Sequence, residues 1–157
     1  MYERIFVAID DDVERGRTII RKAIGLAGAS KARVVIGHVI DSTALETAGM
    51  YSNDFVQNAE RDFRDAIEDV VSDGIASGKT GGIDVTVKRG RVRETLLDDM
   101  IEPYDPDLVI CGARGLSPLR YALLGSISTF LARSARCDVL IVKDGSRQPD
   151  TKEPNGR

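Results

Sequence analysis

Residues 107–128 read DLVICGARGLSPLRYALLGSIS, in which a short apolar run leads into a glycine-containing segment and then into Gly125-Ser126. An apolar run without polar alternation is typical of a strand that is buried on both faces of a sheet. From Ser126 to about Ala135 the pattern is that of a helix. A buried strand, a glycine loop and a helix in this order predict one strand-to-helix unit of a parallel sheet.

The same alternation of strand and helix continues along the rest of the chain. Five apolar runs predict strands, at 5–9, 33–40, 83–87, 107–111 and 139–142. Helical spacing predicts helices at about 14–30, 54–77, 91–102 and 126–135. Strand 83–87 alternates with polar residues, so we expect it at an edge of the sheet. The fold class is therefore α/β: a parallel sheet of five strands with helices on both faces, ordered either 3-2-1-4-5 or 2-1-3-4-5.

The remaining segments are expected to lie outside the regular elements. Residues 41–53 are predicted to form a loop, either a lid over a ligand or a plain surface loop. Residues 144–157 contain no apolar residue and are predicted to form a disordered polar tail. We expect residues 1–143 to form a single domain.

Composition narrows the classes of function. The 157 residues carry a formal net charge of −3 and lack tryptophan, and aromatic residues make up only 5%. Nucleic-acid binding is therefore not expected, because it usually needs a concentrated basic face. Neither a signal peptide nor a membrane-spanning run is evident, so we expect a cytoplasmic protein. Cys111 and Cys137 are interpreted as free core thiols.

A parallel sheet of this kind binds ligands beyond the carboxyl ends of its strands, where the strand order reverses. In the order 3-2-1-4-5 the first and fourth strands are neighbours at that point. Their carboxyl ends carry Asp10-Asp11-Asp12 and Gly112-Ala113-Arg114-Gly115. We therefore predict a crevice between an acidic cluster and a glycine turn.

The glycine segment has features of a phosphate site. Gly112 and Gly115 permit positive φ and let backbone N–H groups approach a ligand. Gly125-Ser126 opens the next helix, whose free N–H groups and positive dipole end favour an anion. The Ser126 hydroxyl can either cap this helix or donate to a phosphate oxygen. The alternative for each residue is a tight turn and a helix cap without a ligand.

At this segment the sequence resembles the nucleotide-binding branch of the universal stress protein family. The signature of that branch is Gly, two residues, Gly, nine residues and then Gly-Ser or Gly-Thr, which Gly112, Gly115, Gly125 and Ser126 meet without insertion. The resemblance extends over about residues 1–143. It includes an apolar first strand ending in Asp10, the segments 38–41 and 137–142, and a Gly90 turn after the third strand.

The resemblance implies an adenine nucleotide alpha hydrolase-like, Rossmann-like fold with strand order 3-2-1-4-5. It also implies a homodimer through the fifth strands, Val139–Val142, and ATP or another adenine nucleotide in the crevice. By position, Ala8, Ile9 and Asp10 would lie near adenine or ribose, and Val39 would offer backbone contacts to adenine. The residues expected around ribose and phosphates are Gly112, Arg114, Gly115, Gly125, Ser126, Ile127 and Ser128.

One departure concerns the residues after the first strand, where many family members have a small-residue turn. This chain has Asp11, Asp12, Val13 and Glu14. Carboxylates near a triphosphate would repel it unless they point outward or share a cation. We consider two alternatives: Mg²⁺ or Mn²⁺ bridges the phosphates, with Arg114 as a partial counter-charge, or the acids only cap and solvate the first helix.

The leading hypothesis is an ATP-binding regulatory protein without catalytic residues, since no Walker lysine follows the glycine loop. The alternatives are a slow ATPase or nucleotidyl-transfer enzyme, a phosphoryl receiver, and a dimerisation module without a ligand. A receiver would need an acceptor aspartate where the third strand ends in Lys88-Arg89-Gly90. For the only histidine, His38, a core role is favoured over a general base. For the basic run 88–93, a solvated edge is favoured over contact with phosphates or a partner.

Overall fold

The protein folds around a parallel sheet of five strands in the order β3-β2-β1-β4-β5. The computed structural model describes residues 1–49, 52–113 and 125–143. The strands are β1 Arg4–Ile9, β2 Arg33–Asp41, β3 Gly82–Gly90, β4 Leu108–Gly112 and β5 Asp138–Val142. All four neighbouring pairs are parallel. The predicted α/β class is confirmed, the order is the first of the two considered, and β3 lies at an edge as expected.

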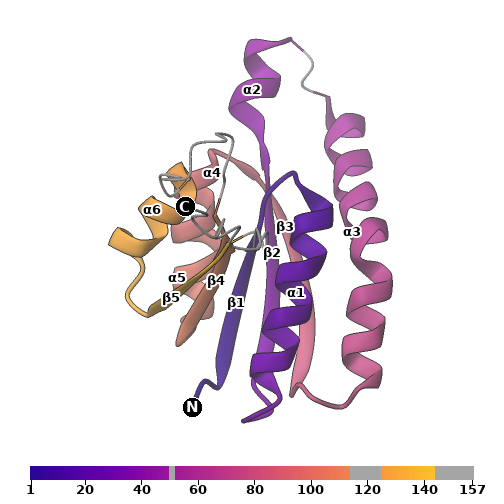
Figure 1. Ribbon diagram of the computed structural model, residues 1–157. Coiled ribbons are helices and arrows are strands. Elements are labelled where there is room, and N and C mark those ends of the chain that lie inside the picture. The colour runs from indigo at the N-terminus through magenta and orange to yellow at the C-terminus, as the bar shows by residue number, and fades with distance from the viewer. Residues whose placement is uncertain (50–51, 114–124, 144–157) are drawn as a thin grey trace, which may run out of the picture.

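Helices cover both faces of the sheet (Figure 1). On one face α1 (Val13–Ala27) and α3 (Asn53–Ala76) enclose a core with the inward side chains of β1 and β2, among them Ile5, Val7 and Ile36. On the other face lie α4 (Val92–Glu94), η1 (Thr95–Ile101), α5 (Glu102–Tyr104) and α6 (Ser126–Ser134), which pack over Phe6 and Val109. Adjacent strand residues point to opposite faces, so β1 supplies both cores.

The predicted loop 41–53 was wrong in one respect, because it contains the helix α2, Ser42–Thr47. This helix has six residues, which is too short to show an apolar stripe of helical period. Its start is instead set by Asp41, whose Oδ1 accepts a hydrogen bond from the Thr43 backbone N–H at 3.0 Å. In Figure 1, α2 stands above the carboxyl end of the sheet.

The predicted helix 91–102 is a continuous helical run made of α4, η1 and α5. Its middle part, Thr95–Ile101, is a π-helix, a form that admits one residue more per turn and is frequent near functional sites. Pro103 lies within the run, in α5, directly after the π-helix, and does not end it. The run ends at Asp105, which has a left-handed conformation with φ +52°.

The turn between β3 and α4 depends on Gly90. Its φ is +152°, a value that L side chains rarely adopt, and a Cβ here would collide with Thr95 Oγ1. The chain can therefore leave the sheet edge and enter α4 within two residues. This turn brings the α4 residues to the carboxyl end of the sheet.

The polar tail, the cysteines and a membrane-spanning helix were the remaining subjects of the sequence analysis. The predicted polar tail 144–157 lies outside the described ranges. Cys111 is buried, Cys137 is half-buried, and neither forms a disulfide. None of the helices in the described ranges is long and apolar enough to cross a membrane.

Candidate functional site

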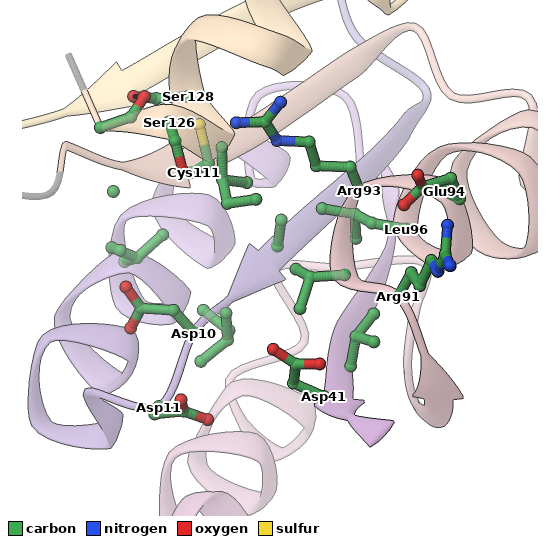
Figure 2. A pocket seen from close by; sticks show the side chains of 18 of the residues that line it. Asp10, Asp11, Asp41, Arg91, Arg93, Glu94, Leu96, Cys111, Ser126 and Ser128 are labelled. Atoms are coloured by element: carbon green, nitrogen blue, oxygen red, sulfur yellow. Dashed lines mark hydrogen bonds between the residues drawn. The ribbon is translucent and has the colours of Figure 1, made fainter. Parts of the chain in front are cut away.

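A cavity of about 470 Å³ opens at the carboxyl ends of β1, β2 and β4, facing α4 and the first turn of α6. This volume is in the range of small-molecule sites. Figure 2 shows the side chains that line it. The lining residues are Ala8, Ile9, Asp10, Asp11, Ile19, Val39, Asp41, Thr43, Arg91, Val92, Arg93, Glu94, Leu96, Cys111, Gly112, Gly125, Ser126, Ile127 and Ser128.

The acidic turn after β1 is held by its own side chains. The Asp12 N–H donates to Asp10 Oδ1 at 2.9 Å, and Asp12 Oδ1 accepts from the Arg15 N–H at 3.1 Å. Asp12 is thus the N-cap of α1, which the structure shows directly. Asp10 and Asp11 instead line the cavity. The three adjacent carboxylates therefore divide into a helix cap and two cavity residues.

His38 lies on the far side of this turn and belongs to the core. Its ring stacks on Phe63 with a centroid distance of 4.4 Å, and only 7% of the residue is exposed. Its Nδ1 is 2.9 Å from the Ile9 carbonyl oxygen, and its Nε2 is 3.8 Å from Asp11 Oδ1. The histidine does not line the cavity, which agrees with the core role favoured from sequence.

Gly112 ends β4 at the cavity, and one of the two reasons expected from the sequence, a positive φ, does not apply to it. It is a strand residue. A Cβ at this position would lie 3.0 Å from Ile19 Cδ1 and 3.4 Å from Arg15 Cδ. The close approach of α1 therefore favours a glycine at this position, and the approach of its N–H group to a ligand stays a prediction. Arg15 also donates from Nη1 to the Ala113 carbonyl oxygen at 3.3 Å, which ties the end of β4 to α1.

The first turn of α6 closes another side of the cavity. Gly125 is the N-cap residue, with φ −57° and ψ 159°, and no side chain caps this helix. The first intrahelical bond runs from the Thr129 N–H to the Gly125 oxygen, so the N–H groups of the three preceding residues have no helical acceptor. Ser128 is buried and donates its hydroxyl to the Gly125 oxygen at 2.9 Å. Ser126 therefore does not cap α6, and of the two roles considered for its hydroxyl, donation to a phosphate stays a prediction.

The third wall combines apolar and charged residues from β2, α4 and η1. Ala8, Val39 and Leu96 are all buried and belong to one core cluster, to which Val92 is added at its edge. Beside this apolar wall stand Asp41, Arg91, Arg93 and Glu94. One end of the cavity is thus apolar, and its rim is charged.

The basic residues of the run 88–93 point to different places in the structure. Lys88 turns away and donates to the Asp99 backbone oxygen at 2.9 Å, whereas Arg91 and Arg93 line the cavity. Arg91 and Arg93 are both exposed, which agrees with the solvated edge favoured from sequence, and the structure adds that they line the cavity. The available signal was their position directly after the glycine that ends the third strand, since that is the ligand end of a parallel sheet.

The charges on the cavity are mixed. The lining contains four carboxylates, of Asp10, Asp11, Asp41 and Glu94, and the two arginines. Within residues 1–49, 52–113 and 125–143 no group of three His, Cys, Asp or Glu side chains could hold a metal ion by itself. Burial raises the pKa of the Cys111 thiol to about 11, so this lining residue is a neutral thiol at physiological pH.

Most of the residues predicted for the site come together in this one cavity. Arg114 and Gly115 lie outside the described residues. The other nine all line it: Ala8, Ile9, Asp10, Val39, Gly112, Gly125, Ser126, Ile127 and Ser128. Their ligand contacts remain predictions.

Comparison with known proteins gives consistent results. A 142-residue stretch is 24% identical to a protein of Staphylococcus saprophyticus described as a universal stress protein, covering 90% of this chain and 84% of that one. The fold is similar to that of the universal stress protein UspA from Lactobacillus plantarum, with a TM-score of 0.72, 22% identity and coverage of 90% and 97% of the two chains.

Two further solved structures with this fold contain adenine nucleotides. A universal stress protein in complex with cAMP has a TM-score of 0.59 and 23% identity, covering 90% of this chain and 97% of that one. The universal stress protein from Archaeoglobus fulgidus in complex with dAMP has a TM-score of 0.61 and 19% identity, covering 90% and 98%.

The model of the universal stress protein family matches residues 1–143, which contain every described strand and helix. This chain therefore belongs to the universal stress protein family.

Proposed function

We propose that this protein is an ATP-binding regulatory protein of the cytoplasm that acts as a homodimer. The observation that carries the nucleotide proposal is the convergence of nine predicted site residues on one cavity that has an apolar end and a helix N-terminus. The family relatives crystallised with cAMP and dAMP support an adenine nucleotide as the class of ligand.

The two ends of the cavity suit the two ends of a nucleotide. The apolar wall of Ala8, Val39 and Leu96 offers a surface for the adenine ring, and backbone groups of β2 can accept and donate hydrogen bonds at its edge. The N–H groups in the first turn of α6, which have no acceptor within the helix, offer hydrogen bonds and a positive dipole end to phosphates. In this orientation Asp10 and Gly112 lie between them, at the level of the ribose.

A divalent cation fits this arrangement only together with the nucleotide. Asp10 and Asp11 both line the cavity, but no third protein ligand accompanies them among the described residues. Mg²⁺ commonly binds through one or two carboxylates plus substrate phosphates and water. We therefore propose Mg²⁺ or Mn²⁺ as a companion of ATP, held by Asp11 and the phosphates, which would offset the repulsion between them.

Binding is better supported than catalysis. The histidine is buried in the α3 side of the core, and the Cys111 thiol has a raised pKa, so neither is an evident base or nucleophile. The observation on the enzyme side is that two adjacent carboxylates, Asp10 and Asp11, line the cavity and could bind the metal of an ATPase. Phosphate release of several turnovers per second by the purified protein would favour that alternative.

The test of the nucleotide site uses Ser126→Glu with Ser126→Ala as its control. A carboxylate in the first turn of a helix stabilises the helix, so the folded state should be retained, while the same charge repels phosphates. We expect Ser126→Glu to weaken ATP binding at least tenfold in isothermal titration calorimetry, with an unchanged or higher melting temperature. Ser126→Ala keeps the backbone N–H groups and should weaken binding much less. Equal ATP affinity in the wild type and Ser126→Glu would contradict the proposal.

A further inference from the structure

Arg93 connects α4 with α6 across the cavity. Its guanidinium carbon lies 5.7 Å from the centroid of the Phe130 ring, a distance at which a cation is attracted to an aromatic face. Figure 2 shows the Arg93 side chain extending over the cavity toward Ser126, whereas the Arg91 side chain lies beside Glu94. The contact with Phe130 therefore holds a positive charge near the first turn of α6.

The guanidinium of Arg93 is available for a ligand. The residue is exposed, and no carboxylate of the described residues forms an ion pair with it. Arg17 shows the contrast, because both of its terminal nitrogens donate to the Asp69 carboxylate at 2.6 Å. A guanidinium presents five N–H donors in a planar fork that matches a phosphate group.

The charge balance of the cavity favours such a contact with a polyphosphate. Four lining carboxylates would repel a nucleotide whose charge increases with each phosphate. The N–H groups at the start of α6 can satisfy the oxygens of one phosphate. Arg93 approaches the same end of the cavity from the opposite side, where its guanidinium can donate to a second or third phosphate.

We propose that Arg93 contacts the distal phosphates of the bound nucleotide and makes the site selective for adenosine di- and triphosphates over AMP and adenosine. This inference rests on the nucleotide site proposed above and adds the residue that selects the phosphate number. Phe130 is a positioning residue, because it acts only through the guanidinium that lies on its ring.

The experiment compares four ligands on the full chain: ATP, ADP, AMP and adenosine, each titrated by calorimetry in the presence of Mg²⁺. Arg93→Ala removes the contact, and Arg93→Lys keeps the charge without the planar fork. Arg133→Ala is the matched control, since Arg133 is an exposed arginine in the last turn of α6 that does not line the cavity. Phe130→Leu tests the positioning role, and a thermal melt of each variant checks folding.

We expect Arg93→Ala to weaken ATP binding about tenfold, the effect of one charge-assisted hydrogen bond, and ADP binding by a similar factor. Adenosine and AMP affinities should change less than about twofold, so the ratio of ATP to AMP affinity falls. Arg93→Lys should recover part of the loss, Phe130→Leu should lower the same ratio by a smaller factor, and Arg133→Ala should leave the ratio unchanged.

The possible results distinguish a failure of the Arg93 inference from a failure of the proposed nucleotide binding. If the wild type binds ATP and Arg93→Ala binds it equally well, the inference fails and the nucleotide site stands. If Arg93→Ala weakens adenosine as much as ATP, Arg93 contacts the base, and the inference is likewise overturned. If the wild type binds none of the four ligands, the proposed function fails and takes the inference with it.

Discussion

At the scale of single residues, Asp11 and Asp12 show how neighbouring identical side chains acquire different roles. Asp12 accepts a hydrogen bond from the Arg15 N–H and caps α1. The Asp11 side chain is 86% exposed and lines the cavity. The backbone turn after β1 sends one carboxylate toward the helix start and leaves the other at the ligand end.

This division predicts opposite behaviour for two substitutions. Asp12→Ala should lower the free energy of unfolding by about 1 kcal/mol, as measured in urea, because an N-cap is lost. Asp11→Asn should leave stability nearly unchanged and alter ligand binding. If Mg²⁺ bridges Asp11 and the phosphates, Asp11→Asn weakens ATP binding in Mg²⁺ by up to about fivefold and strengthens it in EDTA, where only repulsion remains. A change of the same sign in both buffers would remove the metal from the proposal.

At the scale of elements, most of the fold could be predicted because strands and helices carry distinct apolar periods. The runs 5–9 and 108–111 are buried, as a continuous apolar run indicates, and their short length favours a strand over a helix. The helix α2 could not be predicted, since six residues capped by Asp41 have no period to detect. The contact between Arg93 and Phe130 could not be predicted either, because the two residues are on different helices and only the folded chain brings them together.

The packing of α1 against α3 could not be predicted from the sequence either, because it is reinforced by an ion pair between residues on the two helices. Arg17 on α1 donates two hydrogen bonds to the Asp69 carboxylate on α3 and a third, at 2.7 Å, to the Ala66 backbone oxygen. The hydrogen bonds from Arg17 lower the pKa of Asp69 to about 2. A fork that binds one carboxylate and one carbonyl fixes the two helices in register.

The lowered pKa of Asp69 makes the stabilisation by the Arg17–Asp69 pair depend on pH. A folded-state pKa of about 2 lies below the ordinary value of 3.8, so the stabilisation is present above pH 4 and is lost as the pH falls toward 2. Asp69→Asn should therefore lower the melting temperature at pH 7, and its difference from the wild type should shrink as the pH falls from about 4 toward 2. Asp65→Asn, which removes an exposed carboxylate from the same helix, is the control. A pH-independent difference for Asp69→Asn would show that the pair does not titrate as described.

At the scale of the whole molecule, the sheet has two unlike edges. The β3 edge alternates apolar and polar residues and carries Lys88 and Arg89, whereas β5 is a run of four apolar residues, Val139–Val142. Exposed apolar edge strands are templates for aggregation unless something pairs with them. Val139 and Ile141 pack on the α6 side of the core, while Leu140 is 39% exposed.

A second copy of the chain is the partner proposed for this edge, and the surface offers a matched pair of leucines to test it. Leu140→Lys places a charge on the β5 edge, and Leu26→Lys places the same charge on α1, where the leucine is exposed to a similar degree, 42%. In analytical ultracentrifugation we expect the wild type and Leu26→Lys to sediment as dimers. Leu140→Lys should sediment as a folded monomer, because a buried lysine without a partner opposes association. A monomeric wild type would contradict the dimer, and dissociation by both variants would show that charge alone, rather than the β5 edge, controls assembly.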